Sequence, residues 1–415
     1  MPRTKNILSM LGTLAPLVVV SLACGQAPRG QGMRFPTTGK EAPGLAPLDD
    51  AVMAMMRRHG IPGASLAVAK DGKLVFARGY GWAVLEARTP VQPDTVFGLA
   101  SLSKSITALA TLKLVEQGKL SLEGRVFKIL NTEPLAAVRV DPRLYQITIR
   151  QLLNHSGGWD RQVSGDPVNW TTQVKMKYGP QTAISPRHLI AFTMGEPLDF
   201  DPGTECRYCN FGYLLLGEVI ARVSGQSYEK FVRDNVLIPM GLRNVAVPPG
   251  NGTYAPNQAR RYLSGATREL PGWEQSYLNA VGGWTASAVD LARLLTAVDG
   301  SRGKRFLSDK MFAEMIAPPP PPLKPKADGS YVGLGWDIVN RRDKAFTYFK
   351  DGSWYGMRCF MKRLPSGINW VLMFNASMDP DVFDRQAVLE AAKEVREAVE
   401  RMERFPNIDL FEEYR

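Results

Sequence analysis

Residues 98–104 read Gly98-Leu99-Ala100-Ser101-Leu102-Ser103-Lys104. They lie between a short extended run, Thr95–Leu99, and an apolar helical run, Ile106–Gln117, which Gly118 ends. Positions i and i+3 of a helix share a face, so the Lys104 ammonium can reach the Ser101 hydroxyl. The stretch therefore indicates a serine hydrolase whose base is not histidine.

The Ser-x-x-Lys pattern occurs three times, and only its context selects one. Ser227–Lys230 follows Gly225 and opens an ordinary surface helix, while Ser301–Lys304 belongs to a stretch typical of a turn. Only Ser101 lies between an extended run and a strongly apolar helix. We expect Ser101 to be the nucleophile.

Composition narrows the class of protein. With 415 residues, of which 45% are hydrophobic, the chain can bury a large core of two or three domains. The net charge of +11 comes from 51 basic and 40 acidic residues without a basic block interleaved with aromatics, so no nucleic-acid partner is indicated. The excess suits either attraction to anionic envelope polymers or a solvated basic surface.

The N-terminus predicts export to a bacterial cell envelope. Arg3 and Lys5 precede an apolar run, so residues 1–23 are predicted as a signal peptide and residues 24–46 as a flexible tether. Cleavage after a small-x-small site, lipidation of Cys24 in a loose lipobox, and an uncleaved anchor remain alternatives. Later segments are too short or too polar to cross a bilayer, so we expect membrane contact only through the N-terminus. The mature protein would be periplasmic or lipid-anchored, and monomeric.

The remaining cysteines are Cys206, Cys209 and Cys359. The first two form a Cys-x-x-Cys, but there is no second pair, and the three histidines lack ligand spacing. We expect neither a metal nor a cofactor. A disulfide among the three thiols and buried free thiols are both compatible with the sequence.

Periodicity predicts an α/β (α+β) fold, an antiparallel sheet flanked by helices with an all-helical insert. Asp71-Gly72 is a type I′ hairpin signal between two early strands. The α/β domain is predicted to be discontinuous, 47–130 plus 283–405, with a helical domain at 131–282 and a tail at 406–415. The helices are expected at 48–59, 149–153, 186–192, 211–223, 228–236 and 383–402, the strands at 64–69, 73–80, 334–339, 345–349, 355–361 and 370–375, and an exposed polyproline loop at 318–322.

Two later segments supply the other groups that such a hydrolase needs. Tyr208-Cys209-Asn210 immediately precedes a helix, and Lys350-Asp351-Gly352-Ser353 ends a strand-like run. The Tyr-x-Asn and Lys-x-Gly patterns each occur elsewhere in the chain, so their position relative to Ser101 selects the relevant copies. Together with Ser101 they fall before, inside and after the helical insert, and can meet where the two domains join. These three motifs resemble the Ser-x-x-Lys, Ser-Asp-Asn and Lys-Thr-Gly set of penicillin-binding proteins and β-lactamases.

From about Leu48 to Asn375 the chain resembles the serine β-lactamase and penicillin-binding protein superfamily. The closest likeness is to its class C-like branch, which includes class C β-lactamases, D-alanyl-D-alanine carboxypeptidases, D-aminopeptidases and β-lactamase-like esterases. The resemblance is carried by residues 98–104, 116–120 (Glu-Gln-Gly-Lys-Leu), 149–158 (Ile-Arg-Gln-Leu-Leu-Asn-His-Ser-Gly-Gly), the Pro-Gly-Thr and Tyr-x-Asn pair, and Leu334-Gly335-Trp336.

The resemblance implies a role for each site residue. Ser101 is the acylated nucleophile, Lys104 its proton partner, Tyr208 the general base, Asn210 a ligand of substrate and lysine, and Lys350 a second cation. The Lys-x-Gly element adds Gly352, and the oxyanion hole is implied to be the backbone N–H groups of Ser101 and Ser353. An ammonium about 4 Å from a phenol, at an effective dielectric near 20, is worth roughly 4 kcal/mol, which would bring the pKa of Tyr208 to roughly 7.

Each of these residues also has a structural interpretation. Tyr208 could be a core tyrosine, Asn210 could cap the following helix, and Lys350 could be a solvated residue at a strand end. His155 is interpreted as a structural loop residue rather than a base.

The third motif departs from the family, because Asp351 stands where threonine is usual. This element helps the relatives to hold a substrate carboxylate, which an aspartate repels unless strand alternation turns it away. We expect weak or no penicillinase activity and a preference for small ester, amide or peptide substrates with a neutral or cationic acyl group. A β-lactamase, a D,D-carboxypeptidase acting on cell-wall fragments, and a catalytically silent envelope binding protein on the same fold remain alternatives.

Overall fold

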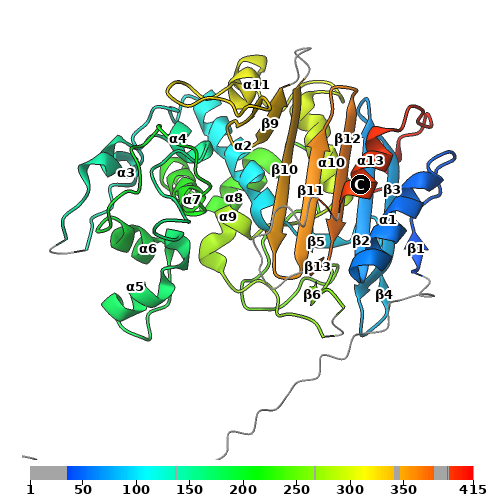
Figure 1. The fold of residues 1–415 in the computed structure, drawn as a ribbon, viewed down its shortest axis with the longest axis horizontal. Helices are drawn as coiled ribbons and strands as arrows, with labels where there is room; N and C mark the ends of the chain where they lie inside the picture. Colours follow the sequence, from blue (N-terminus) through cyan, green and yellow to red (C-terminus); the bar gives the residue numbers. More distant parts are fainter. Residues whose placement is uncertain are drawn as a thin grey trace, which may run out of the picture. The chain divides into compact units, whose positions relative to one another are not determined.

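The computed structural model describes residues 35–135, 138–265, 268–340, 346–377, 390 and 392–414. Its largest feature is a nine-stranded antiparallel sheet, seen at the centre and right of Figure 1. The strands are β1 (Thr37–Thr38), β2 (Gly63–Lys70), β3 (Lys73–Val84), β4 (Thr89–Pro90), β8 (Ser330–Val332), β9 (Asp337–Asn340), β10 (Phe346–Trp354), β11 (Met357–Arg363) and β12 (Ile368–Phe374). They follow the order β1-β3-β2-β12-β11-β10-β9-β8, with β4 paired to β3.

The predicted hairpin is confirmed between β2 and β3. Asp71 and Gly72 have φ angles of 46° and 81°, the left-handed conformation that a type I′ turn requires at both positions. In the centre of the sheet β2 pairs with β12, from Ala64 opposite Phe374 to Lys70 opposite Ile368. This pairing joins the early and late parts of the chain. The centre of the sheet therefore depends on contacts between residues about 300 positions apart in sequence.

Helices cover both faces of the sheet. α1 (Ala46–His59) and α13 (Lys393–Glu400) pack together on one face, where α1 buries Leu48, Val52, Met55 and Met56 at helical spacing. α10 (Ala288–Asp299) packs on the other face against β2 and β12 (Figure 1). The fold class predicted from periodicity is confirmed.

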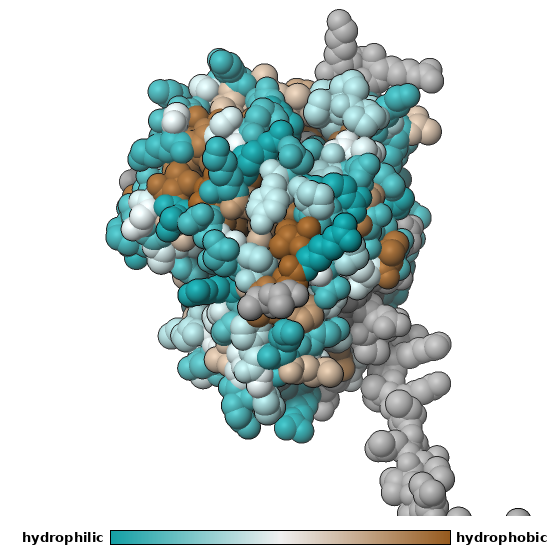
Figure 2. All heavy atoms as spheres, turned by 90° about the vertical axis from the view of Figure 1, so that its left-hand side faces the viewer, coloured by the Kyte–Doolittle hydropathy of each residue, from teal (hydrophilic) through white to brown (hydrophobic). Residues whose placement is uncertain are grey.

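The helical part lies beyond β10, on the left of Figure 1. Its central helix, α2 (Ser103–Glu116), packs against α7 (Phe211–Ser224) and α9 (Asn279–Gly282), and is buried on nearly all sides. The outer face of this part is mainly hydrophilic, with separate apolar areas (Figure 2). The remaining elements are α3 (Val126–Leu130), α4 (Ile149–Leu153), α5 (Thr171–Tyr178), α6 (Pro186–Thr193), α8 (Tyr228–Val232) with a π-helical turn at Arg233–Leu237, α11 (Asp309–Ile316), β5 (Val96–Gly98), β6 (Tyr262–Leu263), β7 (Thr285–Ser287) and β13 (Ala376–Ser377).

Most predicted elements are found within a few residues of their expected bounds, but the strand predicted at 334–339 is partly wrong. Only its end belongs to β9, because the chain turns at Gly335, whose φ is 89°. A Cβ at Gly335 would lie 2.2 Å from the Cβ of Ala108, so this turn is pressed against α2. Residues 334–336 therefore form a packed turn, and the strand begins only at Asp337.

Several expectations fall at the chain ends. The signal peptide and Cys24 lie outside the described residues, as does most of the first half of the helix predicted at 383–402. Thr37–Thr38, within the predicted tether, pairs with β3, and Leu410 and Phe411 of the predicted tail are buried. The division into 47–130 plus 283–405 and 131–282 stays a prediction. Within the described residues, no helix combines the length and apolarity that crossing a bilayer demands.

Candidate active site

Ser101 lies in a 3₁₀ turn, Ala100–Leu102, that joins β5 to α2. Ala100 has a φ of 44°, which is uncommon for a residue with a Cβ and is found where surrounding contacts enforce it. The preceding residue is held by a 2.9 Å bond from the Leu99 N–H to the carbonyl of Trp284. These constraints leave Ser101 partly exposed while its neighbours Ala100 and Leu102 are buried.

β10 passes directly against this turn at Gly352. A Cβ at Gly352 would lie 2.0 Å from the Leu99 carbonyl oxygen and 2.9 Å from the Leu102 nitrogen. Only glycine fits at this position. The close approach explains the glycine of the third motif, and it brings Lys350 and Ser353 to the cavity that Ser101 lines.

Lys104 lies beneath Ser101 and is fully buried. Its ammonium nitrogen is 3.1 Å from the Ser101 hydroxyl oxygen and 3.0 Å from the carbonyl oxygen of Val281. Burial lowers the pKa of Lys104 well below its usual value, Lys350 and Arg161 lower it further, and Asp166 and Cys209 oppose them. The site thus favours the uncharged amine, which can accept the Ser101 proton.

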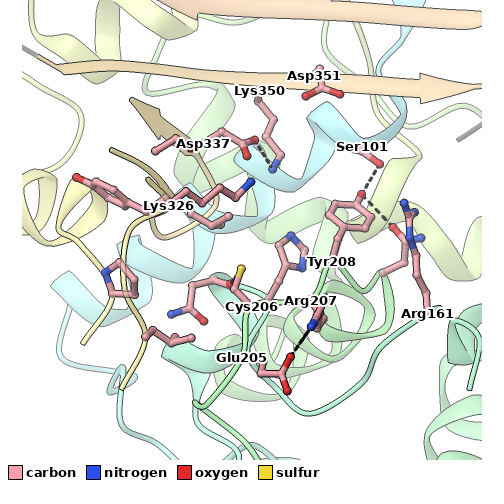
Figure 3. Close-up of a pocket in the computed structure, with 18 of the residues that line it drawn as sticks. Ser101, Arg161, Glu205, Cys206, Arg207, Tyr208, Lys326, Asp337, Lys350 and Asp351 are labelled. Carbon is pink, nitrogen blue, oxygen red and sulfur yellow. Dashed lines mark hydrogen bonds and ion pairs between the residues drawn. The ribbon is translucent and has the colours of Figure 1, made fainter. Parts of the chain in front are cut away.

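Tyr208 contacts Ser101 from the opposite side. Its hydroxyl lies 2.7 Å from the Ser101 hydroxyl and 3.3 Å from Oδ1 of Asn210 (Figure 3). The Nζ atom of Lys104 and the Arg161 guanidinium each lie 5.1 Å from the centre of its ring. The ring of His155 lies 4.6 Å away. Ser101, Lys104 and Tyr208, three of the four residues expected to be catalytic, are therefore brought together.

The expected pKa of roughly 7 for Tyr208 is wrong in direction. Burial raises the pKa of Tyr208, the hydrogen bond with Ser101 opposes this, and Asp166 and Asp351 raise it further. The expectation counted the attraction of a charged lysine but not the cost of placing a phenolate in a buried site. Tyr208 is accordingly a phenol at neutral pH, and Lys104 is the better candidate for the base.

Asp166 is a site residue that the sequence did not reveal. Its carboxylate accepts hydrogen bonds from the backbone N–H groups of Asn210, at 2.7 Å, and Phe211, at 3.3 Å, which begin α7. The side chain of Asn210 makes no such capping bond, so its alternative role as a helix cap is not realised. Asp166 is buried, and desolvation raises its pKa. An aspartate before a proline signals a turn, but nothing local indicates the distant helix that it caps.

Lys350 forms an ion pair with Asp337, a second residue that sequence reasoning missed. The Lys350 Nζ lies 3.2 Å from the Asp337 carboxylate, and the two side chains are 5% and 16% exposed (Figure 3). Lys350 is therefore not a solvated residue at a strand end. Asp337 follows the Leu-Gly-Trp motif in sequence, and only the pairing of β9 with β10 brings it to Lys350.

The cavity beside these residues has a volume of about 710 Å³. Of the predicted residues, those that line it are Ser101, Tyr208, Asn210, Lys350 and Ser353, while Lys104 is buried behind Ser101.

Asp351 also lines the cavity, although strand alternation was expected to allow it to turn away. β9 pairs with β10 only over Phe346–Phe349. From Lys350 onward no described strand neighbours this side of β10, and Lys350, Asp351 and Ser353 line the cavity.

The three described cysteines are free thiols, which removes the predicted disulfide alternative. Cys206 lines the cavity, and its thiol donates to the Asn154 carbonyl at 3.2 Å. Cys209 and Cys359 are buried, and the thiol of Cys359 donates to the Leu99 carbonyl at 2.9 Å. In the described ranges, no three His, Cys, Asp or Glu side chains gather in a way that could hold a metal ion.

Comparison with known proteins gives several matches. Protein flp of Staphylococcus aureus is 31% identical over 204 residues, which cover 49% of this chain and 38% of that protein. The chain thus spans well under half the length of this relative. Penicillin-binding protein 4* of Bacillus subtilis is 28% identical over 355 residues, covering 81% of this chain and 73% of its own.

Among solved structures, the octameric penicillin-binding protein homologue from Pyrococcus abyssi is similar to 86% of this chain and 79% of its own, with a TM-score of 0.68 and 27% identity. The model of the Beta-lactamase family matches residues 48–393. The resemblance drawn from the motifs is confirmed. The match spans most of the chain, and the chain therefore belongs to the Beta-lactamase family of serine hydrolases.

Proposed function

We propose that the protein hydrolyses esters or amides through an acyl-enzyme on Ser101. The observation that carries the proposal is the position of the Ser101 hydroxyl, 3.1 Å from the buried Lys104 amine and 2.7 Å from the Tyr208 hydroxyl. Nucleophile and base lie within the hydrogen-bond reach that proton transfer requires.

The same distances suggest how acylation proceeds. The Lys104 amine takes the Ser101 proton while the serine oxygen attacks the substrate carbonyl. The backbone N–H groups of Ser101 and Ser353 would then hold the oxyanion, a contribution of roughly 3–4 kcal/mol per donor in other hydrolases. The Lys104 ammonium then gives its proton to the leaving group, while Tyr208 stays a phenol and positions Ser101 through its 2.7 Å hydrogen bond.

Deacylation repeats these proton transfers with water. The Lys104 amine takes a proton from water, the hydroxide attacks the ester, and the Lys104 ammonium gives that proton to the departing Ser101 oxygen. In this scheme Asn210 keeps the Tyr208 hydroxyl in place through its 3.3 Å contact. No cofactor takes part in these steps.

We propose that the acyl group of the substrate is neutral or cationic near the reacting carbonyl. Lys350 is paired with Asp337, and Asp351 lines the cavity, so a carboxylate held at this motif meets a neutralised lysine and a second acid. These features favour small esters, amides or peptides with a D-amino-acid amino terminus over penicillins. Penicillin or D-Ala-D-Ala hydrolysis remains the alternative reaction at the same serine.

A hydrolysis panel tests the proposal. Nitrocefin, p-nitrophenyl butyrate and D-Ala-p-nitroanilide are offered to the wild type and Ser101→Ala, together with covalent labelling by a fluorophosphonate. We expect turnover of the ester or the anilide, and labelling that Ser101→Ala abolishes. Ser301→Ala is a matched control, because Ser301 belongs to another Ser-x-x-Lys in an exposed turn. No labelling of the wild type by any acylating probe would instead favour a silent binding protein, and efficient turnover of benzylpenicillin would contradict the substrate preference.

We also propose export to the bacterial cell envelope, with Cys24 as the candidate lipid anchor and a monomeric mature form. The support is the sequence pattern of the first residues. Fractionation of cells that express the wild type and Cys24→Ala tests it. A Cys24→Ala protein that still partitions into the membrane fraction would end the lipid hypothesis.

A further inference from the structure

The loop between α11 and β8 carries two lysines to the catalytic cavity. At its start, the Tyr331 hydroxyl donates to the Ile316 carbonyl at 2.7 Å. At its end, the Lys326 N–H donates to the Ser330 carbonyl at 2.8 Å, and the Lys326 carbonyl accepts from the Gly329 N–H at 2.9 Å. The backbone of Lys326 is therefore fixed on both sides by a tight turn, although its side chain is exposed.

The same loop and the adjoining strand β8 give the cavity an apolar wall, which we call the proline wall. Its members are Pro319, Pro322, Leu323, Tyr331 and Val332, and Lys324 and Lys326 lie beside them in the cavity lining. Figure 3 shows Lys326 on the side of the cavity opposite Ser101, with its ammonium pointing inward toward the pair of Lys350 and Asp337. An apolar surface that ends at a cation suits an apolar chain that ends in an anion.

The charges of the cavity differ in how they are engaged. Lys350 is paired with Asp337, and Arg207 is paired with Glu205. In the described part of the chain, Lys324 and Lys326 form no ion pair. Five cationic and three acidic side chains line the cavity, so its charge is positive, and two of the five cations, Lys324 and Lys326, lie on the loop. Lys326 also acts electrostatically on the exposed Asp328 of this loop.

Lys326 also acts electrostatically on the thiol of Cys206, which lines the cavity. Burial raises the pKa of this thiol and Asp337 raises it further, while Lys326, Lys350 and Arg207 oppose them. Lys326 is thus within electrostatic reach of a group that lines the cavity, and of a substrate bound there.

We propose that Lys326, assisted by Lys324, binds an anionic end group of the substrate. The inference rests on the proposed hydrolysis at Ser101 and names the substrate class more closely. One arm of the ester or amide is neutral near the carbonyl, runs along the proline wall and ends in a carboxylate. Recognition of the anion then belongs to this loop, because Lys350 is engaged by Asp337.

Two ester families test the inference, one for each arm of the substrate. The acyl-arm family consists of mono-4-nitrophenyl glutarate, adipate and suberate, each compared with its methyl-capped neutral ester. The alcohol-arm family consists of butyrate esters of hydroxybutanoic and hydroxyhexanoic acid, compared with those of the matching hydroxyamides. The chain length that gives the strongest preference reports the distance from Ser101 to the Lys326 ammonium. The kcat/KM of each pair is measured for the wild type, Lys326→Gln, Lys326→Arg and the control Lys310→Gln, an exposed lysine of α11 that does not line the cavity.

We expect the anionic member to be preferred roughly two- to five-fold in one family, the size of an exposed ion pair, with an optimum at one chain length. Lys326→Gln should abolish the preference, Lys326→Arg and Lys310→Gln should keep it, and added salt should reduce it. No preference in either family, or a preference that survives in the Lys324→Gln/Lys326→Gln double variant, overturns the inference. If the wild type fails to hydrolyse the neutral esters in a Ser101-dependent way, the proposed function fails as well.

Discussion

The Lys350 ammonium lies 3.2 Å from the Asp337 carboxylate, at the wall of the cavity that holds Ser101. The pair is largely buried, so the lysine that the family motif supplies is already neutralised before substrate binds. This relationship, together with Asp351 beside it, separates the cavity from one built to receive a carboxylate near the nucleophile.

Removing Asp337 should release Lys350. We expect Asp337→Asn to be labelled by a fluorescent penicillin at least roughly five-fold faster than the wild type, because even an exposed ion pair is worth up to about 1 kcal/mol and this pair is largely buried. The variant should also lose roughly 3–5 kcal/mol of unfolding free energy, since a buried ammonium is left unpaired. Labelling kinetics and urea unfolding measure the two effects. Asp50→Asn, an exposed acid of α1 that does not line the cavity, is the control. Unchanged labelling of Asp337→Asn would contradict the explanation.

Lys104→Met should lower activity and raise stability. Loss of the base should reduce kcat/KM on p-nitrophenyl butyrate by about 10²- to 10⁴-fold. Burial lowers the pKa of Lys104 in the folded protein, so the unfolded chain binds more protons below its usual pKa, near 10. The stability of the wild type therefore falls as pH decreases from that value through the lowered pKa of the folded state.

The methionine variant lacks this penalty. Its advantage in urea unfolding over the wild type should be larger at pH 6 than at pH 9. A methionine variant that is less stable than the wild type at pH 6 would show that the buried lysine stabilises the fold.

Arg161→Gln should shift the acid limb of the pH–rate profile. Arg161 lowers the pKa of Lys104, with burial and Lys350 as larger causes and Asp166 opposing them. Without this cation the amine holds its proton to a higher pH, so the acid limb of kcat/KM should move upward by up to about one pH unit. Arg207→Gln is the matched control, because Arg207 also lines the cavity but is not among the groups that shift the pKa of Lys104. A limb that stays in place or moves to lower pH would exclude this role for Arg161.

Asp166→Ala should weaken both the fold and the site. It leaves the N–H groups of Asn210 and Phe211 without their acceptor, which should cost about 1–2 kcal/mol of unfolding free energy. Because Asn210 contacts Tyr208, labelling by a fluorophosphonate should also slow down. Asp309→Ala, in the exposed first turn of α11, is the control for a generic loss of acid. A variant that keeps wild-type labelling would show that the cap does not position Tyr208.

The same aspartate gives a second, pH-dependent readout. Burial raises its pKa in the folded state, so the folded protein binds more protons than the unfolded chain between the usual value near 4 and the raised value. Stability should therefore decrease as pH rises through this window. Asp166→Asn keeps the shape of the side chain without its charge and should flatten this part of the unfolding profile.

The sequence by itself determined the features that depend on neighbours in the chain. The spacing of Ser101 and Lys104 on one helix face predicted their contact, and Asp71-Gly72 predicted a hairpin because the turn requires two left-handed residues. Periodic apolar residues predicted α7 and most strands of the sheet. The order of the three motifs predicted that Ser101, Tyr208 and Lys350 meet, and all three line one cavity.

Only the tertiary structure decided the partners and the electrostatics of those residues. Asp166 and Asp337 act on groups 44 and 13 positions away, and no local pattern records either contact. The apolar turn at Gly335 looked like a strand because periodicity does not reveal what packs against a run. The direction of the pKa of Tyr208 depends on its burial, which exceeds the attraction of nearby cations. A sequence identifies the charged residues of a site. Their pKa values and interaction energies depend on burial and distance, which exist only in the folded chain.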